Sequence, residues 1–186
     1  MLPEISLNVL DVAMNSVRAE ASLICILVQE DTKEGLLRIR IEDNGCGMTA
    51  SQTQAVTDPF FTTRSSRKVG LGVPFLKQAA EASGGTFSIE SEPGRGTSVA
   101  AEFDTGNIDC MPLGDICTTV HQLITMYPDM DFLYDRRIDD SSFVLDTRQM
   151  REILGGVPFN EPDVSEFIRG YLEENEAELR SVETGL

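Results

Sequence analysis

The sequence lacks several residue types on which common protein classes depend. Its 186 residues include no tryptophan, one histidine and four cysteines, and only 6% of them are aromatic. No CxxC pair occurs among Cys25, Cys46, Cys110 and Cys117, and His121 alone cannot complete a histidine-rich metal site. The pattern predicts four reduced thiols, as in cytosolic proteins.

Basic residues are also scarce. There are 15 lysines and arginines against 31 aspartates and glutamates, so the formal net charge is −16. Such a surface repels nucleic acid and anionic membrane, and neither is expected as a partner. The sequence shows no apolar run of membrane-spanning length and no signal peptide. Since 41% of the residues are hydrophobic, we expect a folded cytoplasmic protein with a real core.

Hydrophobic periodicity predicts the elements of the first part of the chain. We expect, in order, a helix over 5–19, a hairpin of strands 22–29 and 36–43, a loop-rich centre, a helix over 72–85, and a hairpin of strands 86–91 and 97–103. This order predicts an α+β two-layer sandwich, in which helices cover one face of a mixed sheet.

The pattern changes after Phe103, where a linker-like stretch begins. We then expect a helix over 116–127, strands over 131–138 and 142–147, and helices near 148–154 and 162–180. The sequence therefore predicts two domains, with residues 1–104 as the first. Residues 105–186 form a small C-terminal α+β appendage of unknown role.

The first predicted helix carries polar side chains that suit a phosphate ligand. Asp11 and Asn15 are four residues apart and share a face with Arg18. An amide oxygen such as that of Asn15 can bind Mg²⁺, which prefers oxygen ligands and often takes phosphates as the others. Arg18, together with basic residues at 64, 67 and 68, offers charge-assisted bonds to phosphate.

Glycines recur at three later points, in "DNGCGM" (43–48), "VGLGVPF" (69–75) and "PGRGT" (93–97). Glycines at a helix start leave free N–H groups for an anion, and a carboxylate such as Asp43 can accept a hydrogen bond from the exocyclic amine of a purine. Taken singly, each stretch is an ordinary turn or helix start. Their order along the chain carries the signal.

That order resembles the ATP-binding domain shared by gyrase, Hsp90, histidine kinases and MutL, the GHKL superfamily, and its histidine-kinase branch most. "LNVLDVAMNSVRA" resembles the N-box, "DNGCGM" the first glycine box, "DPFFTTR" the phenylalanine box, and "GLGVPFLKQAAEASGG" the second glycine box. The resemblance covers roughly residues 5–104. It implies a Bergerat-type fold that binds ATP with Mg²⁺.

The resemblance implies a role for individual residues. Asn15 would hold Mg²⁺, Arg18 would contact phosphate, and Asp43 would bind the adenine amino group. Gly45 and Gly47 would let the backbone pass beneath the purine. Further nucleotide-binding positions are implied at Met48, Phe60, Thr62, Lys68, Gly70, Leu71, Gly72, Val73 and Thr97.

Two positions depart from the pattern of the superfamily. Asp11 stands where hydrolysing members carry a glutamate that positions water. Three roles stay open for it: a catalytic base, an anchor in the outer coordination sphere of Mg²⁺, or a plain helix residue.

The lid between Phe60 and Gly70 has only nine residues, which favours rapid nucleotide exchange.

The use made of ATP is also left open. A helical hairpin with a phosphoacceptor histidine does not fit before the first box, so transfer of the γ-phosphate to a partner protein in trans is one hypothesis. His121 is interpreted as a partly buried histidine rather than a displaced phosphoacceptor. The alternative is a regulatory nucleotide-binding module in signalling, with little turnover. A conformational ATPase of the gyrase or Hsp90 kind is disfavoured by Asp11. A homodimer is left open, because relatives often dimerise.

Overall fold

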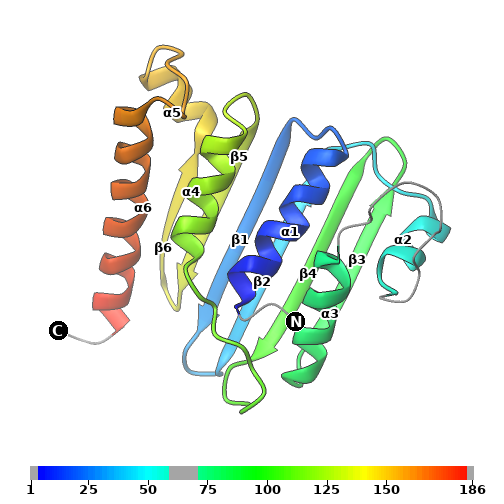
Figure 1. Cartoon of the computed structure of the whole chain (residues 1–186). Coiled ribbons are helices and arrows are strands. Elements are labelled where there is room, and N and C mark those ends of the chain that lie inside the picture. Colours follow the sequence, from blue (N-terminus) through cyan, green and yellow to red (C-terminus); the bar gives the residue numbers. More distant parts are fainter. Residues whose placement is uncertain (1–3, 59–70, 184–186) are drawn as a thin grey trace.

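The computed structural model describes residues 4–58 and 71–183, which form one mixed sheet and a set of helices (Figure 1). The helices are α1 (Ile5–Arg18), α2 (Ala50–Val56), α3 (Gly72–Ala82), α4 (Ile116–Met126), α5 (Thr147–Ile153) and α6 (Pro162–Glu183). The strands are β1 (Leu23–Asp31), β2 (Leu36–Asp43), β3 (Thr86–Glu92), β4 (Gly96–Asp104), β5 (Asp131–Ile138) and β6 (Ser141–Asp146).

The six strands lie in the order β3-β4-β2-β1-β5-β6. Neighbouring strands are antiparallel except β1 and β5, which run parallel. The three hairpins that the sequence predicts, β1-β2, β3-β4 and β5-β6, are all present, because a short turn joins antiparallel neighbours. The step from β4 to β5 passes through α4, since a parallel neighbour needs a longer crossover.

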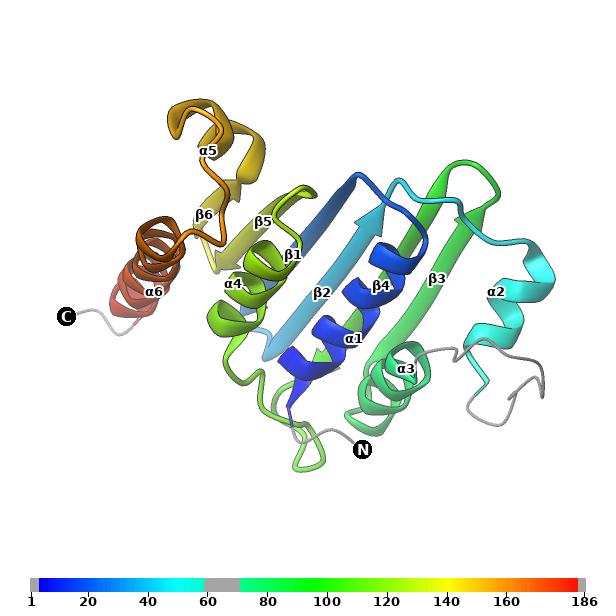
Figure 2. The same ribbon diagram turned by 45° about the horizontal axis from the view of Figure 1, so that its top comes forward.

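Helices α1, α3, α4 and α6 form one layer over one face of the sheet, as Figures 1 and 2 show. Because side chains alternate along a strand, every second residue points into the layer between sheet and helices. The buried strand residues there include Ile24, Ile26, Val28, Leu37, Ile39, Ile41, Val99, Ala101 and Phe103. The fold is therefore the predicted α+β sandwich with a mixed sheet of the Bergerat type.

Helix α1 follows its predicted bounds closely. It buries Ile5, Val9, Val12 and Ala13 along one stripe, which is the periodicity that the sequence showed. Helix α3 ends at Ala82, three residues before the predicted end, and Gly84 then takes a φ of +81°. Glycine adopts this left-handed conformation without steric cost, so it closes the helix.

Helix α2 lies in the stretch that the sequence analysis treated as loop. Thr49 forms a capping box with Gln52, in which each side chain accepts a hydrogen bond from the backbone N–H of the other. None of its residues is buried, so no apolar stripe announced it. The Thr-x-x-Gln spacing was the available signal. In Figure 1, α2 lies beside the free edge of β3.

Residues after 105 extend the same sheet through β5 and β6, so the predicted domain boundary at 104/105 stays a prediction. Arg136 on β5 is fully buried and ties this part to the rest. Its guanidinium donates two hydrogen bonds of 2.9 Å to Glu176 on α6 and also pairs with Glu30 on β1. The pKa of Arg136 is raised: burial opposes its charge, but Glu176 and Glu30 outweigh that effect.

Among the residues that the structure describes, no helix is both long and apolar enough to cross a membrane.

Candidate functional site

A cavity of ≈ 100 Å³ lies between α1 and the ends of β2, β3 and β4. Its lining comprises Val12, Asn15, Ser16, Ala19, Ile41, Asp43, Cys46, Gly47, Met48, Val56, Val73, Ile89, Thr97 and Val99. The walls are mostly apolar, and four side chains supply polar atoms. Ligand cavities for whole drug-sized molecules are usually about 300 Å³ or larger. This one therefore suits a flat heterocycle rather than a complete nucleotide.

Asp43 lies at the end of β2, where the strand leaves the sheet. Its Oδ2 accepts a hydrogen bond of 2.6 Å from the buried hydroxyl of Ser16, and its Oδ1 accepts one of 2.9 Å from the backbone N–H of Gly45. Both bonds fix the carboxylate in the cavity wall. A carboxylate oxygen has more than one lone pair, so Asp43 retains acceptor capacity toward a ligand.

Ser16 and Ser91 were missed by the sequence analysis. The Ser91 hydroxyl accepts a hydrogen bond of 2.8 Å from the Met48 N–H and lies 2.8 Å from the Thr97 hydroxyl. It thereby ties the loop after β2 to the hairpin of β3 and β4. Because Ser91 is close to Met48 only in space, 43 residues apart in the chain, no local pattern pointed to it.

The glycines of the first box fit tightly against protein backbone. A Cβ atom added to Gly45 would lie 2.7 Å from the carbonyl oxygen of Ala19, at the end of α1. One added to Gly47, whose φ is +67°, would lie 1.9 Å from the carbonyl oxygen of Glu92. The structure thus gives these glycines a packing reason of their own, beside the predicted role under a purine.

Asn15 lines the cavity from α1 and has an incompletely bonded amide. Its Oδ1 accepts a hydrogen bond of 3.0 Å from exposed Arg18, while its Nδ2 is buried and has no hydrogen-bond partner among the described residues. Two other buried side-chain atoms share that condition, Asn8 Oδ1 and Tyr134 Oη, but neither residue lines the cavity. The unpaired amide group marks a place for a polar ligand.

Asp11 lies one turn before Asn15 and does not line the cavity. It makes no hydrogen bond or ion pair within residues 4–58 and 71–183. It lies against Gly72 at the start of α3, where an added Cβ would come within 2.5 Å of the Asp11 Cβ. The close packing of α1 on α3 therefore needs the glycine.

The N-terminus of α3 carries no side-chain cap, and its N-cap residue Leu71 is exposed. The first N–H groups of a helix lack intrahelical partners, so those of Gly72 and Val73 are oriented to bind an anion. Val73 also lines the cavity. The remaining predicted positions, Phe60, Thr62, Lys68 and Gly70, together with Arg64, Arg67 and the predicted lid, lie outside the described residues.

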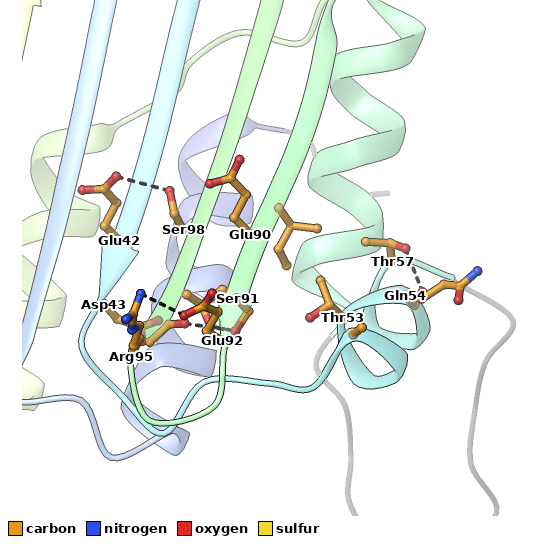
Figure 3. A pocket seen from close by; sticks show the side chains of 14 residues that line it. Glu42, Asp43, Thr53, Gln54, Thr57, Glu90, Ser91, Glu92, Arg95 and Ser98 are labelled. Atoms are coloured by element: carbon orange, nitrogen blue, oxygen red, sulfur yellow. Dashed lines mark hydrogen bonds and ion pairs between the residues drawn. The ribbon is translucent and has the colours of Figure 1, made fainter.

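A wider hollow of ≈ 870 Å³ lies between α2 and the strands β3, β4 and β2. It shares Asp43, Ile89 and Thr97 with the cavity. Figure 3 shows Glu42, Glu90 and Glu92 on its strand side, Gln54 on α2 and Thr57 directly after α2. Its carboxylates would repel phosphate, so the phosphates of a nucleotide are not expected in this hollow.

His121 and Cys46 lie in different settings. His121 is 8% exposed on α4, and its Nε2 lies 2.9 Å from the hydroxyl of Ser165. This is the partly buried histidine of the prediction. Cys46 is exposed at the mouth of the cavity, which it also lines.

The described residues offer few protein ligands for a metal ion. No group of three or more His, Cys, Asp or Glu side chains in the described part of the chain is arranged to hold one. An Mg²⁺ ion bound through nucleotide phosphates needs only one or two protein oxygen ligands. The side-chain oxygen of Asn15 beside the cavity can be such a ligand, because the hydrogen bond from Arg18 leaves it a second lone pair.

A family model described as "Histidine kinase-, DNA gyrase B-, and HSP90-like ATPase" matches residues 2–107. Curated relatives are sensor kinases. The chain is 35% identical over 95 residues to the sensor histidine kinase ZraS of Klebsiella oxytoca, covering 51% of this chain and 20% of that protein. It is 33% identical over 99 residues to the signal transduction histidine-protein kinase AtoS of Escherichia coli (strain K12), covering 53% and 16%. The match spans about a fifth of these relatives or less.

Among solved structures, the chain is similar to the N-terminal domain of a DNA repair protein. The TM-score is 0.57 at 14% identity, over 78% of this chain and 53% of that chain. At this identity the likeness concerns the fold alone. The ordered sequence boxes, the cavity between α1 and the sheet, and the family match over residues 2–107 agree. This chain belongs to the histidine kinase-, DNA gyrase B- and HSP90-like ATPase family.

Proposed function

We propose that the chain binds Mg²⁺-ATP with its adenine in the cavity and transfers the γ-phosphate to a partner protein. The observation that carries the proposal is the anchored carboxylate of Asp43, which faces an apolar cavity sized for a base. An adenine presents an exocyclic amine as a donor, and a fixed acceptor in an apolar wall selects for it.

Each end of the nucleotide would meet a different set of groups. Thr97 and Met48 lie beside the base, held by Ser91. Arg18 and the N–H groups at the start of α3 would contact the phosphates, and Asn15 would hold Mg²⁺. When bound, the metal would neutralise phosphate charge. Phosphoryl transfer depends mainly on positioning and charge neutralisation, which agrees with the few polar side chains here.

Asp11 has a restricted role in this proposal. It lies one turn from Asn15 and has no partner among the described residues, so in this proposal it would accept a proton from an attacking group or bind water near the metal. During transfer, the acceptor atom of the partner forms the new bond to the γ-phosphorus. The bond to the bridging oxygen breaks, and ADP leaves with that electron pair.

The continuous sheet also supports a second function, the regulation of partner binding by the nucleotide. Residues 105–183 share the sheet with the nucleotide site, so a bound nucleotide could regulate partner binding by that part without turnover. Measured turnover of ATP distinguishes transfer from regulation.

The test follows γ-labelled ATP with Mg²⁺, using the purified chain alone and with an extract of its own cells. Asp43→Asn is the test variant and Glu42→Gln the control, because Glu42 is adjacent in sequence but exposed. We expect Asp43→Asn to weaken ATP binding at least tenfold, since a hydrogen bond to a charged group contributes about 1.5–3 kcal/mol.

Label on one extract protein, lost in Asp43→Asn and kept in Glu42→Gln, would support transfer in trans. Tight ATP binding with no label and no released phosphate would favour the regulatory function. Equal ATP affinity of both variants and the natural chain would contradict the proposed adenine site.

A further inference from the structure

An apolar groove of ≈ 260 Å³ lies at the opposite end of the sheet, beyond the part that matches the family. Three elements form it: the edge strand β6, the short helix α5 and the N-terminal half of α6. Its lining residues are Val144, Leu145, Asp146, Gln149, Met150, Ile153, Leu154, Phe167 and Tyr171. Figure 1 shows α5 and α6 on either side of the end of β6.

The groove gathers side chains that a folded chain normally buries. Ile153 is 83% exposed, Phe167 57% and Val144 48%. They are three of the eight large hydrophobic side chains that are exposed in the described part of the chain. Since scattered single residues need no explanation but a contiguous patch does, this convergence marks an interaction surface.

The rim of the groove along α6 is acidic. Counting from the groove residues Phe167 and Tyr171, Asp163 lies four residues earlier, Glu174 three residues later, and Glu178 a further turn on, so all share one helix face. All three are exposed, and none forms an ion pair with a described residue.

Cations near the groove are already engaged. Arg148 pairs with Asp146 at 2.7 Å, and Arg169 pairs with Glu166 at 3.6 Å. The surface thus offers apolar side chains framed by unpaired negative charge. Such a surface is complementary to a helix with an apolar stripe and basic flanks.

We propose that this groove binds a basic amphipathic helix of a partner protein. The apolar stripe of that helix lies over Val144, Ile153 and Phe167, and its lysines or arginines meet Asp163, Glu174 and Glu178. A second copy of the chain is disfavoured as the occupant, because each copy carries a net charge of −16 and the rims would repel. This proposal is independent of ATP binding.

The residues that line the groove favour binding of a helix over addition of a strand to β6. The hydroxyl of Tyr171 on α6 donates a hydrogen bond of 3.4 Å to the carbonyl of Val144, which occupies one polar group of β6. The groove is lined by side chains of two helices as well as of β6, which suits the apolar stripe of a helix. Amphipathic helices bind such channels through residues at i, i+3 or i+4, and i+7.

The test uses a fluorescent, amidated Leu-Lys helix of about 18 residues, since shorter isolated helices are marginal in water. One control peptide keeps the leucines and replaces lysine with glutamate. A second has the same Leu-Lys composition in scrambled order. Fluorescence anisotropy with the full chain measures binding, at low and at high salt.

We expect the Leu-Lys helix to bind at least ~10-fold more tightly than either control peptide. Phe167→Ala should weaken it by about tenfold or more, as for an aromatic anchor in a contact surface. Ile108→Ala and Val182→Ala are matched controls, because Ile108 is 97% and Val182 62% exposed outside the groove. Both should bind as the natural chain does. All three side chains concerned are exposed, and circular dichroism melts check that each variant folds.

The joint variant Asp163→Asn with Glu174→Gln should lower affinity and flatten the salt dependence, since two of the three rim charges are then removed. Unchanged binding by Phe167→Ala, or equal binding of the scrambled peptide, would overturn the proposal. A concentration-dependent dimer of the natural chain that Phe167→Ala abolishes would instead assign the groove to a second copy, which also overturns it.

Discussion

The two ends of the sheet use polar groups in opposite ways. At the cavity, Asp43 and Asn15 keep unused hydrogen-bonding capacity beside an open space. Beyond β1, Arg136 is more deeply buried than either of them and is saturated, with carboxylates of Glu30 and Glu176 and backbone carbonyls as acceptors. The comparison teaches that a buried polar residue marks a binding site only where its bonds are incomplete. A complete network indicates structure.

The largest expected effect is on stability, at the end of the sheet where all hydrogen bonds of Arg136 are made. Arg136→Ala should lower the free energy of unfolding by about 3 kcal/mol, because two largely buried carboxylates are left without their main partner. Arg137→Ala is the control, since Arg137 pairs with Asp135 on the exposed side of the same strand. Urea unfolding measures both. Equal free energies of unfolding for the two variants would show that the buried hydrogen-bond network of Arg136 does not stabilise this end of the sheet.

Thiol reactivity sharpens the same comparison. Burial, followed by the charge of Glu176, raises the pKa of Cys117 to about 12, whereas Cys46 is exposed at the cavity. Only the thiolate reacts, so at pH 8 we expect iodoacetamide to label Cys46 faster than Cys117 by a factor on the order of 100 or more.

Saturating ATP should slow the labelling of Cys46 and leave Cys117 unchanged, because only Cys46 lines the cavity. Mass spectrometry of the digested chain gives both rates. Labelling of Cys46 that ignores ATP would place the nucleotide elsewhere.

A smaller effect is expected at Ser16, whose hydroxyl orients Asp43. Ser16→Ala should weaken ATP binding roughly three- to tenfold, since it removes one hydrogen bond to the carboxylate. Ser98→Ala is the matched control. The Ser98 hydroxyl donates a hydrogen bond of 3.2 Å to the Glu42 carboxylate, and Ser98 does not line the cavity. Calorimetric titration with ATP measures the difference. Similar affinities for the two variants would show that Ser16 is not needed to orient Asp43.

The smallest effect depends on pH. The hydrogen bond from Arg148 lowers the pKa of Asp146, with burial opposing. A carboxyl with a lowered folded pKa stabilises the fold above its ordinary pKa of about 3.9, and that contribution is lost as pH falls toward the folded value. Asp146→Asn should therefore reduce stability by about 0.5 kcal/mol at pH 6 and by less at pH 3, as urea unfolding can measure.

Much of the fold was predictable because its signals are local. The three hairpins and the helices α1, α3 and α4 follow from alternating or helical patterns within single segments. Helix α2 was missed because it buries nothing. Of the predicted site residues, Asn15, Asp43, Gly47, Met48, Val73 and Thr97 line one cavity. Asp11, Arg18, Gly45, Leu71 and Gly72 lie around it, outside its lining.

Sequence and structure therefore determined different properties of this protein. The sequence by itself determined the family and the sheet hairpins, because ordered motifs and periodic side chains are written along the chain. Only the tertiary structure decided that Ser16 donates a hydrogen bond to Asp43 and that Arg136 pairs with Glu30 and Glu176, which lie 106 and 40 positions away. The tertiary structure alone also brings β6, α5 and α6 together around an apolar groove. These are contacts between distant segments, and no local pattern encodes which segments will meet.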